Sequence, residues 1–516
     1  MFANLRQAML WLHSVLGLAC AGVLFVAFFM GSLALYDSEL DRWMLPQTRL
    51  SAPAAELSLD RQILPEVERL TTGQALEQWY VELPNSRVPV LRLQSWDLQD
   101  QGQSQFIDPA TGRVVAATSS RGGDFFYRFH YMLHLQAGSL GLLLVGLASM
   151  VGLLVIVAGV LIHVRLFKDF FSFRPDKAPR RLLDLHNLSG VFALPFFLFI
   201  LLSGLLISFP QYLPAGLLAA YPEQPGEFAS EARDTFNRPP LGLPGRLASL
   251  DAMAAQARAI WQGGEPAFVR VWHPGDAGAY VEISRSLADR LSSDGETLFF
   301  DGASGQLLHQ SRLKPAAATY SLLAGLHVAH FQQPLLRALY FLAGISGCLM
   351  LASGLLYWIE KRRLRLPEGR AGLRLMQVLA VSLITGLPLA TLAMLAANRL
   401  LPATLAQRAS WEVWLFFAAW LAAVLHSSLS VYRAEHRAPW RVQCAVIGLL
   451  ALAVPLLNGL TTGDYLWRTL GQGQWAVAGV DGVLLLVAGL SGGAWLRLAR
   501  RETRTRALLG EAQEDA

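Results

Sequence analysis

The chain has 516 residues, of which 53% are hydrophobic and only 16% are charged. A soluble domain carries about a quarter charged residues, so this composition excludes an ordinary soluble protein. The net charge of +5 does not indicate nucleic-acid binding, because the Lys and Arg residues lie beside apolar blocks, where they orient membrane spans.

Eight apolar blocks are long enough to cross about 30 Å of hydrocarbon as helices. They cover residues 13–36, 130–163, 186–209, 324–359, 373–397, 411–432, 441–460 and 475–497. The first block, within the segment 1–36, is expected to remain uncleaved, because it is longer than the apolar region of a signal peptide. The pattern predicts an α-helical integral membrane protein with about eight transmembrane helices, surrounded by membrane lipid.

Clusters of Lys and Arg indicate how these spans are oriented. The clusters occupy residues 165–181, 361–374, 433–441 and 497–506. If the predicted spans alternate in direction, all of the clusters fall on one side, which the positive-inside rule makes cytoplasmic. We therefore expect both termini, the loop 164–185 and the tail 498–516 in the cytoplasm.

Two long polar segments, residues 37–129 and 210–323, are then expected outside the cytoplasm. Both contain alternating apolar and polar residues, as in Val88–Gln94 and Phe268–Trp272. Such alternation is typical of half-buried strands. The sequence therefore predicts two small outer α+β domains.

The chain also contains an internal repeat. One common offset relates His13, Gly17 and Gly31 to His186, Gly190 and Gly204. Residues 1–170 and 180–363 are therefore predicted to be two copies of a helix, an outer domain and a second helix. Residues 373–497 lack this pattern and are predicted to form an appended four-helix membrane bundle. A parallel repeat places equivalent residues at equal depth in the membrane, so we expect His13 and His186 at the cytoplasmic ends of facing helices.

Most of the eleven histidines gather near the ends of predicted spans. The cytoplasmic group is His13, His163 and His186; the outer group is His130, His134, His327 and His330. Neutral imidazole is a good iron ligand, and two imidazoles can serve as the axial ligands of a haem iron. The two groups therefore predict about two b-type haems. The alternative is that these histidines are polar residues of the membrane interface.

The expected ligands follow from the repeat. We expect His13 and His186 to bind the iron of the cytoplasmic-side haem, with His163 as the fallback. We expect His134 and His327 to bind the iron of the outer haem. His130 is the alternative to His134, and His330 is a further candidate.

Other cofactors and reactions lack a motif in this chain. No CxxCH occurs, which excludes covalently attached c-type haem. No GxGxxG, P-loop or HExxH occurs either, so no flavin or NAD site and no catalytic acid–base residue is recognisable. The electron donor would have to be a quinol or a redox protein.

Several motifs resemble those of the PepSY-associated transmembrane helix family. They are Trp11–Ser14, Tyr36–Met44, Phe125–Leu135, Gly159–Pro175, Leu183–Asn187 and Leu326–Phe331. The resemblance covers about residues 1–363, the outer segments resemble PepSY domains, and the last four spans look like the extension of a longer subgroup. It implies a bacterial inner-membrane protein, often linked to iron acquisition, and some relatives are haem-containing reductases of ferric siderophores. By this resemblance, family histidine positions are occupied by His13, His130, His134, His163, His186 and His327.

The leading hypothesis is therefore electron transfer through two b-type haems to a ferric siderophore or other ferric chelate in the periplasm. Two alternatives stay open. PepSY domains are also associated with peptidase binding, so the chain could be a regulatory membrane protein without redox activity. The histidines could instead be transient ligands in a permease for iron or a metal chelate.

Overall fold

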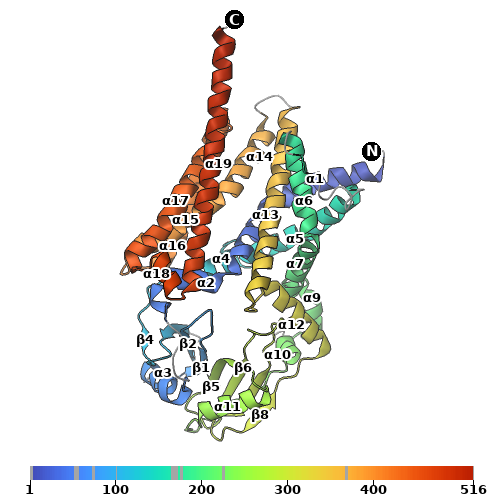
Figure 1. Ribbon diagram of the computed structural model, residues 1–516. Coiled ribbons are helices and arrows are strands. Elements are labelled where there is room, and N and C mark those ends of the chain that lie inside the picture. Colours follow the sequence, from blue (N-terminus) through green and yellow to red (C-terminus); the bar gives the residue numbers. More distant parts are fainter. Residues whose placement is uncertain are drawn as a thin grey trace. The chain divides into compact units, whose positions relative to one another are not determined.

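The computed structural model describes residues 4–50, 57–71, 76–99, 102–163, 173–174, 178–223, 227–365 and 370–514. Much of the predicted cytoplasmic loop, residues 164–172 and 175–177, lies outside this range. The chain divides into two compact units (Figure 1). The helical unit comprises Met1–Met44, Ser119–Leu202 and Leu339–Ala516, and the sheet unit comprises Leu45–Thr118 and Ser203–Ala338.

Seven helical stretches among the described residues are long and apolar enough to cross a membrane. They are α1 (Leu5–Ala34), α5 (Leu140–Ile162), α13 (Pro334–Arg363), the run Ala371–Leu400, α16 (Arg408–Tyr432), α17 (Ala438–Thr462) and Trp475–Thr503 of α19 (Trp475–Glu514). An eighth is present if α6 (Ala178–Phe192) and α7 (Leu194–Ile207), which meet at a 65° bend, form one span. The expected multi-pass helical architecture is confirmed.

Three of the predicted spans are interrupted where we expected continuous helices, and the third of the eight is the one bent by 65° between α6 and α7. The second was expected to begin at residue 130, but α4 (Asp124–Met132) ends in a turn and α5 begins at Leu140. The fourth was expected to begin at residue 324, but α12 (Pro315–Val328) is separated from α13. The breaks have the left-handed φ of His134 (+53°) and Ala329 (+58°), which a helix does not tolerate. Hydropathy averaged over a long window did not reveal them, because each turn is short.

The remaining helices are short or form part of the run Ala371–Leu400. They are α2 (Asp37–Met44), η1 (Pro46–Thr48), η2 (Leu59–Ile63), α3 (Leu64–Thr71), α8 (Phe209–Tyr212), α9 (Pro214–Ala220), α10 (Glu227–Arg233), α11 (Leu250–Ile260), α14 (Ala371–Val381), η3 (Ser382–Gly386), α15 (Leu387–Leu400) and α18 (Leu466–Gly471).

Helix α5 has one exposed face and one face that packs against a neighbouring helix. Leu147, Leu154 and Leu161 recur every seventh residue and are 52–59% exposed, as expected for a face in contact with lipid. The opposite face carries small residues, and Gly152 approaches Leu24 of α1. Small residues let helices pack closely in a membrane, which brings α1 and α5 together along their length.

The sheet unit contains a single antiparallel sheet of eight strands rather than two separate sheets. Its order is β4-β3-β2-β1-β5-β6-β7-β8. The strands are β1 (Leu76–Glu82), β2 (Leu91–Asp97), β3 (Gly102–Ile107), β4 (Val114–Val115), β5 (Pro266–Trp272), β6 (Tyr280–Arg285), β7 (Thr297–Asp301) and β8 (Leu307–Gln310). Each predicted outer segment contributes four consecutive strands, and β1 pairs with β5 to join them. One face packs against α3 and α11 in a common apolar core.

A reciprocal pair of helix caps also joins the two halves of this unit. The sequence Ser-Leu-Asp occurs at residues 58–60 and again at 249–251. Asp251 accepts hydrogen bonds from Ser58 Oγ at 2.5 Å and from the Leu59 amide at 2.6 Å. Asp60 accepts the equivalent bonds from Ser249 Oγ at 2.5 Å and the Leu250 amide at 2.8 Å. Each half therefore caps a helix of the other half.

This reciprocity predicts equal effects for the two aspartates. Asp60→Ala and Asp251→Ala should each destabilise the sheet unit by about 1–2 kcal/mol, because each removes a cap and its charge-assisted hydrogen bonds. Hydrogen–deuterium exchange of the β1 and β5 amides in the purified full chain measures this, with an expected acceleration of about tenfold. Asp289→Ala is the control, since its ion pair with Arg285 leaves the carboxylate 63% exposed. A strong effect of one aspartate alone would contradict reciprocal capping.

Candidate functional site

His13 of α1 lies against the backbone of α5. Its Nδ1 is 2.9 Å from the carbonyl oxygen of Val155. A Cβ atom built on Gly159 would lie 3.1 Å from His13 Cε1, so the ring rests on the surface that glycine leaves open.

His186 of α6 has the same arrangement on α13. Its Nδ1 is 2.8 Å from the carbonyl oxygen of Met350. A Cβ atom on Gly354 would lie 2.8 Å from that Nδ1. The internal repeat predicted from the sequence is therefore reproduced in the contacts of these two histidines.

His130 repeats the arrangement a third time, between α4 and α1. Its Nδ1 is 2.7 Å from the Ala27 carbonyl oxygen, and a Cβ atom on Gly31 would lie 2.7 Å from the same nitrogen. In the sheet unit, His327 of α12 lies over Gly204 of α7, where a Cβ atom would be 2.9 Å from its Cε1. The His327 Nδ1 is 2.9 Å from Ser203 Oγ.

The spacing between carbonyl and glycine has a simple steric reason. In three sites the glycine follows the bonded carbonyl by four residues: Val155 and Gly159, Met350 and Gly354, Ala27 and Gly31. A helical carbonyl points toward the residue four positions later, so a side chain there obstructs a ring that approaches from a neighbouring helix. Glycine removes the obstruction.

These hydrogen bonds also determine which ring nitrogen carries the proton. A carbonyl oxygen only accepts, so Nδ1 must donate its N–H in all three sites. In a neutral imidazole this leaves the lone pair of Nε2 available to a metal. A hydrogen-bond acceptor on the other ring nitrogen is the usual companion of a metal-binding histidine, because it fixes ring orientation and raises the basicity of the ligand.

His13 and His186 are brought together, as the repeat predicted. Their ring centres are 6.0 Å apart and their planes are inclined by 80°. A first-row metal binds imidazole nitrogen at about 2.0–2.1 Å, which places the centres of two opposed rings about 6 Å apart. Within the described part of the chain, neither ring has a hydrogen bond at Nε2. At this separation the two histidines would fit two protein ligands of one metal ion.

The number of protein ligands available beside His13 and His186 limits which kind of metal site the pair could form. Among the described residues, no group of three or more His, Cys, Asp or Glu side chains is placed to hold a metal. A zinc site needs three or four protein ligands. A haem iron needs only two from the protein, because the porphyrin supplies four nitrogens. The two-histidine arrangement fits haem better than zinc.

Three further histidines singled out in the sequence lie in different surroundings. His134 follows α4 in the turn and packs among aromatic rings, 5.5 Å from that of Phe125 and 5.4 Å from that of Phe417. His163 ends α5, and its buried Nδ1 has no hydrogen-bond partner among the described residues. His330 is exposed. Of the outer group, His130 and His327 are therefore the two that share the glycine-backed environment.

Comparison with known proteins places the chain in a family. Residues 10–361 match the model of the PepSY-associated TM region. The chain belongs to this family. It is similar to an uncharacterised protein of Pseudomonas aeruginosa, with 31% identity over 325 residues that cover 59% of this chain and 79% of that protein. The resemblance drawn from the motifs is confirmed, and all seven histidines named above lie within the matched range.

A buried ion pair in the helical unit was not expected from the sequence. Glu412 and Arg408 of α16 form a 2.8 Å salt bridge, with side chains 0% and 4% exposed. Glu412 also accepts bonds from Ser120 Oγ at 2.8 Å and the Arg121 amide at 3.0 Å. Ser120 and Arg121 lie just before α4, so the appended bundle holds the segment that leads to His130.

Ser203 was also missed, because a serine within an apolar run resembles an ordinary packing residue. The feature of the sequence that could have identified Ser203 was its position in the internal repeat. Ser203 immediately precedes Gly204, which was already matched to Gly31. A polar residue beside a repeated glycine in an apolar run is a candidate hydrogen-bond partner for a histidine.

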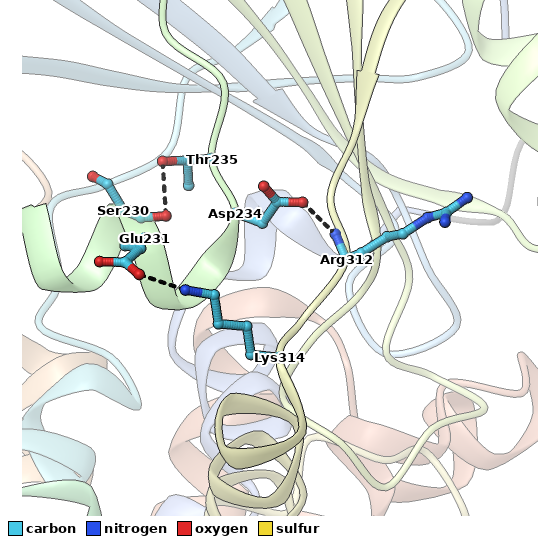
Figure 2. Close-up of a pocket in the computed structure, with 6 residues that line it drawn as sticks. All are labelled: Ser230, Glu231, Asp234, Thr235, Arg312 and Lys314. Atoms are coloured by element: carbon cyan, nitrogen blue, oxygen red, sulfur yellow. Dashed lines mark hydrogen bonds and ion pairs between the residues drawn. The ribbon is translucent and has the colours of Figure 1, made fainter.

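The sheet unit has a pocket of about 420 Å³ between α10 and the segment after β8 (Figure 2). It is lined by Ser230, Glu231, Asp234, Thr235, Arg312 and Lys314. Lys314 forms an ion pair with Glu231, and Asp234 accepts a 2.8 Å bond from the Arg312 amide. In Figure 2 the Arg312 guanidinium points away from these groups. With paired charges of both signs, the pocket offers no metal-ligand set and no clear preference for an anion.

Proposed function

We propose that this protein is a haem-containing electron-transfer protein of the bacterial inner membrane that reduces a ferric siderophore or similar ferric chelate outside the cytoplasm. The observation that carries the proposal is the pair His13 and His186. Both rings are oriented by carbonyl bonds, both have Nε2 available, and their centres are 6.0 Å apart. These two residues would hold the cytoplasmic-side haem.

His130, in the helical unit, and His327, in the sheet unit, are each proposed as a further ligand of haem iron. Each ring lies over a glycine and has its Nδ1 in a hydrogen bond, as in the first pair. We propose His130 here in place of His134, the residue preferred from the sequence. His134 is instead packed among aromatic rings on a strained turn.

The chemistry needs no acid or base from the protein. Bound b-type haem supplies reversible one-electron transfer, while the protein sets its position and potential. Each Fe(III) of the chelate accepts one electron and becomes Fe(II), which hard oxygen ligands hold less tightly. One quinol that loses two electrons and two protons would therefore reduce two ferric ions. A redox protein could donate the same electrons one at a time.

The placement of the reaction follows from charge. Clusters of Lys and Arg between and after the spans favour a cytoplasmic location for those segments. The sheet unit would then lie in the periplasm and both termini in the cytoplasm. A chelate that docks on the outer side could be reduced without crossing the membrane.

The proposal predicts about two b-type haems per chain. Protein purified after expression with ample haem supply should show a Soret band and low-spin b-type bands on reduction. After anaerobic reduction, added ferric siderophore should reoxidise the haem as a ferrous chelator traps Fe(II). Haem-replete expression that yields colourless, folded protein would reject the proposal in favour of a regulatory membrane protein or a permease.

A further inference from the structure

The two histidines of the facing pair donate to carbonyl oxygens that differ in one further contact. His13 Nδ1 lies 2.9 Å from the Val155 carbonyl oxygen, and His186 Nδ1 lies 2.8 Å from that of Met350. The Met350 oxygen also lies 3.1 Å from the hydroxyl oxygen of Ser353. A carbonyl oxygen only accepts, so the hydroxyl and the imidazole both donate to it. All of these residues belong to the helical unit.

Ser353 is held against the backbone of its own helix, α13. Its side chain is 1% exposed, so water does not compete for its hydroxyl. The hydroxyl oxygen is also 2.6 Å from the Leu349 carbonyl oxygen. A hydroxyl has one proton, which Ser353 therefore shares between the carbonyls of Leu349 and Met350. Back-bonding of this kind satisfies a serine inside a helix.

The first repeat has no hydroxyl at the equivalent position. The offset that relates Val155 to Met350 also relates Ala158 to Ser353. Ala158 is 1% exposed, so the two positions are equally buried. A methyl group cannot donate a hydrogen bond, and the two carbonyls that hold the histidine rings therefore differ by one hydroxyl donor.

A second donor on the carbonyl affects the histidine beyond it. Two donors on one oxygen draw on the same lone pairs, so the Met350 carbonyl attracts the His186 Nδ1 proton less strongly than it would alone. A weaker acceptor at Nδ1 leaves Nε2 less basic toward a metal. A less basic ligand stabilises Fe(III) less, and the potential of the iron rises.

We propose that Ser353 is a positioning residue that acts through the Met350 carbonyl to weaken His186 as an iron ligand and to raise the potential of the haem at the His13 and His186 pair. This rests on the proposed function. The two ligands of that iron are then unequal, with His13 the stronger. A raised potential makes the iron easier to reduce, which favours its reduction by the electron donor.

Redox titration of the purified, haem-loaded full chain, followed by haem absorption, tests this role. Ser353→Ala frees the Met350 carbonyl and should lower one midpoint potential, by the equivalent of about a threefold change in the redox equilibrium. Ala158→Ser supplies the hydroxyl to the first repeat and should raise the same potential by a similar amount. Ser149→Ala is the control, because its hydroxyl bonds to the Val145 carbonyl at 2.8 Å, earlier in α5 and outside the two histidine sites.

The outcomes separate this inference from the function on which it rests. Opposite shifts at one haem, with both potentials unchanged in Ser149→Ala, would support the inference. An unchanged or raised potential in Ser353→Ala would overturn it. If Ser353→Ala does not retain that haem, Ala158→Ser decides, since a raised potential supports the inference and an unchanged one overturns it. Wild-type protein without haem would instead reject the proposed function itself.

Discussion

Under the proposed function, purified His186→Ala protein should carry about half the haem of the wild-type protein, because one of the two proposed ligands of one iron is lost. The remaining haem should keep its low-spin spectrum and potential. His13→Ala should give the same result, since the two rings face each other at 6.0 Å. Pyridine haemochrome assay and redox titration measure both quantities. His426→Ala is the control, a histidine of α16 outside the glycine-backed set.

A change at Gly354 tests the same site without removing a ligand. Gly354→Ala places a Cβ atom 2.8 Å from His186 Nδ1, which forces the ring away from the Met350 carbonyl. We expect weakened binding or a high-spin fraction at that haem alone. Gly489→Ala is the matched control, because a Cβ atom at Gly489 meets nothing within 4 Å. Wild-type spectra for both His186→Ala and Gly354→Ala would show that His186 is not a ligand.

The second large effect is expected at Glu412. Its carboxylate accepts hydrogen bonds from Arg408 Nη1 at 2.8 Å and from Asn398 Nδ2 at 2.6 Å, in addition to those from Ser120 and Arg121. Glu412→Ala leaves the Arg408 guanidinium buried without its counter-charge. Breaking a buried ion pair from one side costs about 3–5 kcal/mol. We therefore expect a large drop in the thermal unfolding midpoint of the detergent-solubilised protein.

The control for Glu412 is a second ion pair of the same bundle. Glu502 bonds to Arg441 at 2.5 Å, but the two side chains are 26% and 36% exposed. Partly exposed pairs contribute about 0–1 kcal/mol, so Glu502→Ala should change the midpoint little. Glu412→Gln keeps one acceptor oxygen but loses the negative charge. Its unfolding midpoint should therefore lie between those of Glu412→Ala and Glu502→Ala. Equal midpoints for Glu412→Ala and Glu502→Ala would show that the buried pair contributes no more than an exposed one.

Much of the architecture could be predicted from the sequence because membrane insertion depends on local composition. An apolar run such as 140–162 is long enough to span hydrocarbon whatever surrounds it. The repeat was also visible, since His13 and His186 keep the same distance to a following glycine. The same repeat predicted that these two histidines meet. The breaks at His134 and Ala329 were not predicted, because hydropathy does not report the left-handed φ that ends each helix.

The amino-acid sequence alone therefore determined the membrane-spanning character of the protein, its family and the set of candidate histidine ligands. Only the tertiary structure decided that β1 pairs with β5 in one sheet, and which ring nitrogen of each histidine is bonded. Those features depend on partners far apart in the chain: His13 and Val155 are separated by 142 residues, and Ser203 and His327 by 124. Local patterns constrain a residue's own helix or strand, whereas the orientation of a ring depends on the neighbouring helix that packing brings against it.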